Sequence, residues 1–205
     1  MRNELEKRCL QLSFEHKLSH LSSVLTSVNI IDKIYGVKRK EDIFVLGNSH
    51  AALALFVVLE KYGCANAEEL IKKQGTHASR DPEYDIWVSG GSLAQAETVA
   101  VGLAMADRSR DVFLLTSDGA CAEGAIWETL RIAGEQRLEN LKVTVVANGL
   151  SALGKVDVDL LDLRLQYFYP CLVVKANLFS YPDFLNGIQG HYVIMTKEQY
   201  EESVK

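Results

Sequence analysis

The feature that most constrains the fold of this chain is a stretch in which two short apolar runs flank a segment of helical periodicity. The runs cover 112–116 and 143–147 and are rich in β-branched residues, while the segment between them covers 122–136. Short β-branched runs are typical of buried parallel strands, and parallel strands need a crossover connection, which is usually a helix. The stretch therefore predicts a βαβ unit.

The same alternation of strands and helices continues on both sides of this unit. We expect further strands at 43–46, 172–176 and 192–195, further helices at 2–17, 27–35, 48–61, 67–74, 93–107, 181–188 and from 197 onward, and loops at 75–92 and 148–171. Alternating strands and helices predict an α/β fold with a doubly wound parallel sheet and helices on both faces. Three prolines and the lack of a low-complexity stretch give no sign of a linker, so a single domain over 1–205 is expected.

Composition excludes several classes of protein. The net charge is −5 at pH 7 and no basic cluster offsets it, which argues against binding to nucleic acid. No apolar run approaches the roughly 20 residues that cross a membrane, and the charged first segment lacks the pattern of a signal peptide. The cysteines form no C-x-x-C pair, which favours reduced thiols and a cytoplasmic location; they are Cys9, Cys64, Cys121 and Cys171.

Polar residues follow both strands of the predicted βαβ unit. Asp118 and Asn148 come just after the two apolar runs, and Gly119 precedes the helical segment. The carboxyl ends of parallel strands meet at one edge of the sheet, where ligands bind, and Mg²⁺ prefers carboxylate and amide oxygens together with phosphates. A glycine at a helix start suits a phosphate group. The ordinary alternatives are a helix N-cap for Asp118 and a simple Asn-Gly turn for Asn148.

Four segments of the chain resemble motifs of the transketolase family and stand in the same order. Ser117-Asp118-Gly119, followed later by Asn148, resembles the family's GDG…N thiamine diphosphate motif. The other three segments are SHLSSVLTSVNIIDKIY at 19–35, EDIFVLGNSHAALALFVVLEKYG at 41–63 and VSGGSLAQAETVAVGLAMA at 88–106. The resemblance implies the thiamine diphosphate-binding fold over essentially the whole chain.

The resemblance implies a role for each residue that matches a family motif. The side chains of Asp118 and Asn148 and the main-chain carbonyl of Leu150 would bind Mg²⁺ or Ca²⁺, which bridges the two phosphates of thiamine diphosphate. His20 and His77 would be catalytic and face the substrate hydroxyls and the carbanion centre. The residues implied to contact the cofactor or support its site are His50, Gly91, Ser92, Leu93, Gly119, Glu123, Asn148 and His191, with Glu123 near a subunit interface.

The chain also departs from the family pattern. Ser19, Ser22, Ala94, Ala96 and Ser117 replace glycines of the family motifs. No segment resembles the pyrimidine-binding domain, whose glutamate activates the cofactor ring in the family. The resemblance therefore implies the N-terminal subunit of a split transketolase-like enzyme. Such an enzyme would transfer a two-carbon ketol unit between sugars or sugar phosphates, and it would need self-association, as in a heterotetramer, together with a separate pyrimidine-domain subunit.

Two other functions stay open on the sequence. One is a subunit of another thiamine diphosphate enzyme, of the 2-oxo acid dehydrogenase or deoxyxylulose-phosphate synthase type, although the motifs around His20 and His50 favour transketolase. The other is a non-catalytic scaffold that kept the fold, against which the retained Asp118 and Asn148 argue. Metal-dependent binding of thiamine diphosphate would separate both enzymes from the scaffold.

Overall fold

The computed structural model describes residues 2–176 and 181–204. These residues form two compact units. The helical unit takes in 2–36, 49–78 and 181–204, and the sheet unit takes in 37–48 and 79–176. Each unit is described by itself, and the expectation of a single domain over the whole chain stays a prediction.

The sheet unit contains four parallel strands in the order β1-β2-β3-β6. They are β1 (Ile43–Leu46), β2 (Val112–Ser117), β3 (Leu141–Ala147) and β6 (Cys171–Lys175). The register pairs Ile43 with Val112 and Val112 with Leu141, so β1, β2 and β3 begin level with one another, whereas β6 begins opposite Val143. The expected α/β fold with a parallel sheet is confirmed, and each of these strands begins within two residues of its predicted start.

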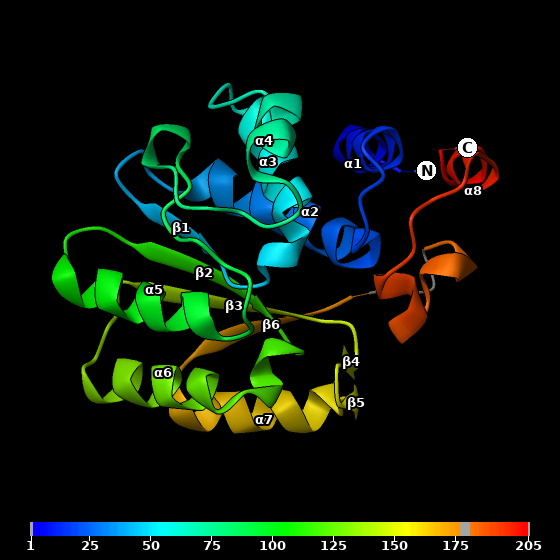
Figure 1. Cartoon of the computed structure of the whole chain (residues 1–205). Coiled ribbons are helices and arrows are strands. Elements are labelled where there is room, and N and C mark those ends of the chain that lie inside the picture. The colour runs from blue at the N-terminus through cyan, green and yellow to red at the C-terminus, as the bar shows by residue number, and fades with distance from the viewer. Residues whose placement is uncertain (1, 177–180, 205) are drawn as a thin grey trace. The chain divides into compact units, whose positions relative to one another are not determined.

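Three helices make the crossovers between successive strands of the sheet unit. They are α5 (Gln95–Ala106), α6 (Gly124–Glu135) and α7 (Val158–Phe168). Because the strand order follows the chain, every crossover steps in the same direction, and right-handed crossovers then place their helices on the same face of the sheet. Figure 1 shows these three helices together on one side of the strands.

The core of the sheet unit lies between the sheet and these helices. β1 and almost all of β3 are buried. Helix α5 presents Ala96, Ala100 and Ala104 to the core at a spacing of four residues, all fully buried. Small side chains on this stripe let the helix backbone lie close to β2.

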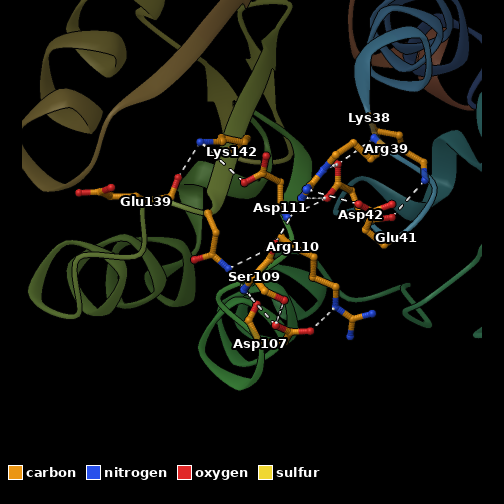
Figure 2. A network of polar contacts seen from close by, with 11 residues as sticks. Lys38, Arg39, Glu41, Asp42, Asp107, Ser109, Arg110, Asp111, Glu139 and Lys142 are labelled. Atoms are coloured by element: carbon orange, nitrogen blue, oxygen red, sulfur yellow. Dashed lines mark hydrogen bonds and ion pairs between the residues drawn. The ribbon is translucent and has the colours of Figure 1, made fainter.

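A network of polar contacts joins the segments at the amino ends of the strands (Figure 2). The buried Asp42 carboxylate accepts hydrogen bonds from the Arg39 guanidinium (2.7 and 3.2 Å) and from the main-chain N–H groups of Arg39 (2.8 Å) and Asp111 (3.0 Å). The Asn140 side chain donates to main-chain carbonyls at the end of α5 and beyond it, those of Ala104, Asp107 and Arg110. Buried polar groups are thus paired at the edge opposite the predicted site.

The helical unit has five α-helices within its described residues. They are α1 (Glu4–Glu15), α2 (Leu21–Val37), α3 (Ala52–Lys61), α4 (Ala67–Gln74) and α8 (Lys197–Ser203), with short 3₁₀ turns η1 (Ser49–Ala51), η5 (Asp183–Leu185) and η6 (Ile188–His191). Capping boxes begin α1, at Asn3 with Glu6, and α8. Phe14 of α1 stacks on Tyr200 of α8, with ring centroids 4.7 Å apart. No helix of the described residues is both long and apolar enough to span a membrane.

Several predicted boundaries differ from the structure. Helix α2 begins at Leu21, not at 27, and its first turns bury the polar side chains of Ser22, Ser23 and Thr26. The predicted loop at 148–171 contains α7 and a hairpin of β4 (Leu150–Ser151) and β5 (Gly154–Lys155).

The C-terminal expectations were the least accurate. The predicted helix at 181–188 is replaced by the turns η5 and η6, and the predicted strand at 192–195 is wrong, since these residues form no strand. Tyr192 and Ile194 are 66% and 52% exposed. The short apolar run there has no neighbouring strand among the described residues to pair with, and an apolar run alone does not supply one.

Candidate functional site

Asp118 and the segment after β3 meet at the carboxyl edge of the sheet unit. Asp118 follows β2 directly and is 2% exposed. Its Oδ2 accepts a hydrogen bond from the Gly149 N–H at 2.7 Å, and its Oδ1 accepts one from the Gly119 N–H at 3.0 Å. The two strand ends that the sequence predicted to converge are therefore in direct contact through this carboxylate.

The turn at 148–150, whose Gly149 N–H donates to Asp118, also carries side-chain and main-chain oxygen atoms. The Asn148 Oδ1 accepts a hydrogen bond from the Leu150 N–H at 2.9 Å, so the Asn-Gly turn named as the ordinary alternative for Asn148 is present. Gly149 adopts a φ of +79°, which favours glycine, and its carbonyl accepts from the Val156 N–H at 2.9 Å. A side chain at Gly119 would lie 3.8 Å from the Leu150 carbonyl oxygen, so Gly119 packs against this turn.

The electrostatic setting of Asp118 suits a cation. Burial raises the pKa of the carboxyl, and the hydrogen bonds from Gly149 and Gly119 partly offset that rise. A positive charge nearby would stabilise the ionised form further. The N-cap position of α6 belongs to Glu123, so the simple alternative of Asp118 as the cap of that helix is not what the structure shows.

The other residues predicted in the sheet unit are accessible. Gly91, Ser92 and Glu123 are exposed, and Leu93 is partly exposed. The loop before α5 ends at Ala94, which has a φ of +60°. A family glycine would adopt this left-handed conformation freely, whereas alanine is strained in it.

Glu97 is a buried acid that the sequence reasoning missed. Its side chain is fully buried in the first turn of α5, and its Oε1 accepts a hydrogen bond from the Thr116 hydroxyl of β2 at 2.5 Å. Among the described residues its Oε2 has no hydrogen-bond partner, and burial raises the pKa of the carboxyl. A side chain at Gly47 would lie 2.4 Å from Oε1, so Gly47 must lack one. The only signal in the sequence was a lone acid in an alanine-rich helix.

The helical unit brings four histidines together, which we call the histidine cluster: His20 before α2, His50 in η1, His77 after α4 and His191 in η6. The His20 ring centroid lies 4.3 Å from that of His191, 5.3 Å from His50 and 6.1 Å from His77, and the His50 and His191 centroids are 4.9 Å apart. All four were predicted as site residues, His20 and His50 from two of the family motifs and His77 and His191 from segments outside those motifs.

Burial and the neighbouring imidazoles determine the protonation of the cluster, and two serine hydroxyls lie beside its ring nitrogens. The Ser19 hydroxyl lies 2.7 Å from His20 Nδ1, and the Ser23 hydroxyl lies 3.2 Å from His50 Nε2. Burial, followed by the neighbouring imidazoles, lowers the pKa of His20 to about 4 and that of His50 to about 3, and burial lowers the pKa of His191. These three imidazoles are therefore neutral at pH 7, and each has one nitrogen that donates and one that accepts.

The two groups of residues differ in the ligands they suit. In the described parts of the chain, no three His, Cys, Asp or Glu side chains are arranged to hold a metal ion. The oxygens near Asp118 are instead one carboxylate, one amide and main-chain carbonyls, a donor set that fits a hard cation carrying phosphate. Burial raises the pKa of the Cys121 thiol, which agrees with a structural role for that residue.

Comparison with known proteins gives the family. Residues 37–171 match the family model described as transketolase, thiamine diphosphate binding domain. The chain is 26% identical over 170 residues to one subunit of apulose-4-phosphate transketolase from Phocaeicola vulgatus, covering 74% of this chain and 60% of the relative. It is 25% identical over 217 residues to 1-deoxy-D-xylulose-5-phosphate synthase of Fusobacterium nucleatum, covering 100% of this chain and 35% of that enzyme.

A solved structure supports the same assignment for the fold. Transketolase from Campylobacter jejuni superposes with a TM-score of 0.71 at 17% identity, covering 98% of this chain and 43% of that one. The chain thus spans 60% or less of the length of each of these three proteins. The family model covers more than half of the sequence, and the chain therefore belongs to the transketolase family, with the thiamine diphosphate-binding domain of that family.

Proposed function

We propose that this chain binds thiamine diphosphate through a divalent cation and is one subunit of a transketolase-like enzyme. The observation that carries the proposal is the contact of the Asp118 carboxylate with the turn at 148–150. Asp118, the Asn148 amide and the Leu150 carbonyl would bind Mg²⁺ or Ca²⁺, and Gly119, beside that turn, would leave room for a diphosphate. His50, Gly91, Ser92, Leu93, Glu123 and His191 would complete the cofactor site.

The histidine cluster would handle protons and hydroxyl groups of the substrate. Thiamine diphosphate, when bound, supplies the carbanion chemistry of ketol transfer. His20 and His77 are the proposed catalytic residues. His20 is a neutral imidazole before substrate binds. One of its ring nitrogens can accept a proton from a substrate hydroxyl, and the other can donate one to a carbonyl oxygen.

A separate chain would supply the rest of the enzyme. The relative from Phocaeicola vulgatus is named as one subunit of its transketolase, and the present chain matches only 43% of the Campylobacter jejuni transketolase. We infer a companion chain with a pyrimidine-binding domain, self-association into a heterotetramer, and sugars or sugar phosphates as donor and acceptor. The similarity to a deoxyxylulose-phosphate synthase along the whole chain supports that enzyme class as the second candidate.

Titration calorimetry with thiamine diphosphate tests the binding step. We expect saturable binding that needs Mg²⁺ and is abolished by EDTA. Asp118→Asn should weaken binding by at least tenfold, the effect of losing about 1.4 kcal/mol of cation binding. Asp111→Asn is the matched control, because Asp111 lies next to the other end of the same strand. Saturable binding whose affinity is changed neither by Mg²⁺ nor by Asp118→Asn would contradict the proposed site. An absence of binding would favour a non-catalytic scaffold.

Substrate assays with a companion pyrimidine-domain chain separate the enzyme classes. Ketol transfer from a ketose to an aldose should appear only when both chains are present. Release of CO₂ from pyruvate in the presence of an aldose phosphate, without ketol transfer, would instead identify the synthase class. Full ketol transfer by this chain alone would contradict the split-enzyme proposal.

A further inference from the structure

The backbone of His20 is held in an unusual conformation. Its φ is +65°, a left-handed value that is strained for a residue with a side chain. The His20 carbonyl accepts from the Val24 N–H at 3.1 Å, as expected at a helix start. The His20 N–H, which would ordinarily have no partner at that position, donates to the His191 carbonyl at 2.9 Å.

The turn that carries His191 closes only with glycine at one position. Gly190 is buried, and a side chain there would lie 2.2 Å from the Leu185 carbonyl oxygen and 2.7 Å from its Cα. These are backbone atoms, so the neighbour has no flexible end that could move away. Gly187, at the start of the same turn, has a φ of +70°. The close approach of Leu185 and Gly190 therefore determines where the His191 carbonyl lies.

We propose that Gly190 and the main chain of His191 form a positioning element that holds His20 in its strained conformation and directs its imidazole into the histidine cluster. Gly190 acts through His191, and the carbonyl of His191 acts through the backbone of His20. The importance of this element for catalysis rests on the proposed function of His20. The claim that it holds the backbone of His20 does not depend on that function. It gives the C-terminal segment a role separate from any contact between the His191 side chain and a cofactor.

The ring of His191 makes a second, separable contribution. It meets the His20 ring edge-on at 4.3 Å. The other aromatic or titratable rings that face His20 are those of His50, His77 and Tyr192. A change that removes the His191 ring but keeps its carbonyl should therefore alter the titration of His20 without releasing its backbone.

Hydrogen exchange and imidazole NMR on the full chain, without cofactor, test the proposal. In the wild-type protein the His20 amide should exchange at least about tenfold more slowly than an unprotected amide. Gly190→Ala should remove this protection and raise the pKa of His20 by about one unit toward its ordinary value. His191→Gln should keep the protection and raise only the pKa. Gly36→Ala is the control, because a side chain there would meet the Tyr62 hydroxyl at 3.4 Å, an ordinary distance, and no other atom of the described residues within 4 Å.

The outcomes distinguish this proposal from the proposed function. A His20 amide that exchanges freely in the wild type, or that stays protected in a folded Gly190→Ala protein, overturns the positioning element. Loss of protection in His191→Gln also overturns it, and that variant keeps the test valid if Gly190→Ala does not fold. A failure of thiamine diphosphate to bind would count against the function alone, because none of these measurements needs the cofactor.

Discussion

Removing the charge of Asp42 should destabilise the sheet unit and make its free energy of unfolding depend less on pH in acid. Asp42 lies just before β1, its side chain is 2% exposed, and its carboxylate accepts four hydrogen bonds from Arg39 and Asp111. Figure 2 shows it at the centre of contacts that join segments distant in the sequence. The substitution Asp42→Asn keeps the shape of the side chain but loses its charge, and it places an amide donor among these donors.

The magnitude follows from the pKa of this carboxyl. Burial alone would raise its pKa, but the hydrogen bonds from Arg39 and the two main-chain N–H groups outweigh burial and lower it to about 2. A fall of nearly two units from the ordinary value corresponds to about 2.5 kcal/mol. Arg39 is 52% exposed, so solvent screening reduces the expected loss to between about 1 and 2 kcal/mol.

The sign of the pH dependence is fixed by which state binds more protons. Between pH 4 and pH 2 the unfolded chain protonates this carboxyl and the folded chain does not, so its contribution is present above about pH 4 and is lost as the pH falls through about 2. Urea denaturation at pH 7, 4 and 2.5 should therefore show a difference between wild type and Asp42→Asn that shrinks with acid. Glu41→Gln is the control, since Glu41 is 57% exposed and contacts the same arginine. A difference below about 0.5 kcal/mol at pH 7 would refute the reasoning.

Three further predictions concern other parts of the chain. Asp157→Ala should lower the free energy of unfolding by about 1 kcal/mol in thermal unfolding, because it removes the side-chain cap on the Leu160 N–H. Asp159→Ala is the control and should have less effect, because Asp159 is exposed in the same turn. Gly47→Ala should destabilise the protein by more than about 1 kcal/mol, and in a double-mutant cycle Glu97→Ala should recover part of that loss; strictly additive effects would show that the two residues do not collide. Lowering the pH from 6.5 toward 4 should reduce the free energy of unfolding, because His20 and His50 bind protons there in the unfolded chain but stay neutral in the folded protein. Denaturation at several pH values should show that His50→Gln reduces the slope of the free energy of unfolding against pH.

The sequence predicted the parts of the fold that depend on local pattern. β1 and α4 have the expected bounds, since each is a short segment with clear signals at both ends. Helix α7 lies within the segment predicted as a loop, although Asp157 supplies an N-cap before an apolar helical run. The predicted strand at 192–195 failed for a different reason. Whether a short apolar run becomes a strand depends on a neighbour that the run itself does not encode.

The candidate site shows the same division between local and non-local information. The meeting of Asp118 with the turn at 148–150 was predictable, because parallel strands bring their carboxyl ends to one edge whatever the details of packing. The strained backbone of His20 was not, because it depends on a carbonyl 171 positions further along the chain. Glu97 was not predictable either, since its burial depends on the space left by Gly47 and on the hydroxyl of Thr116. A motif therefore predicted which residues converge, while the contacts that determine their conformation and charge come from residues that no motif contains.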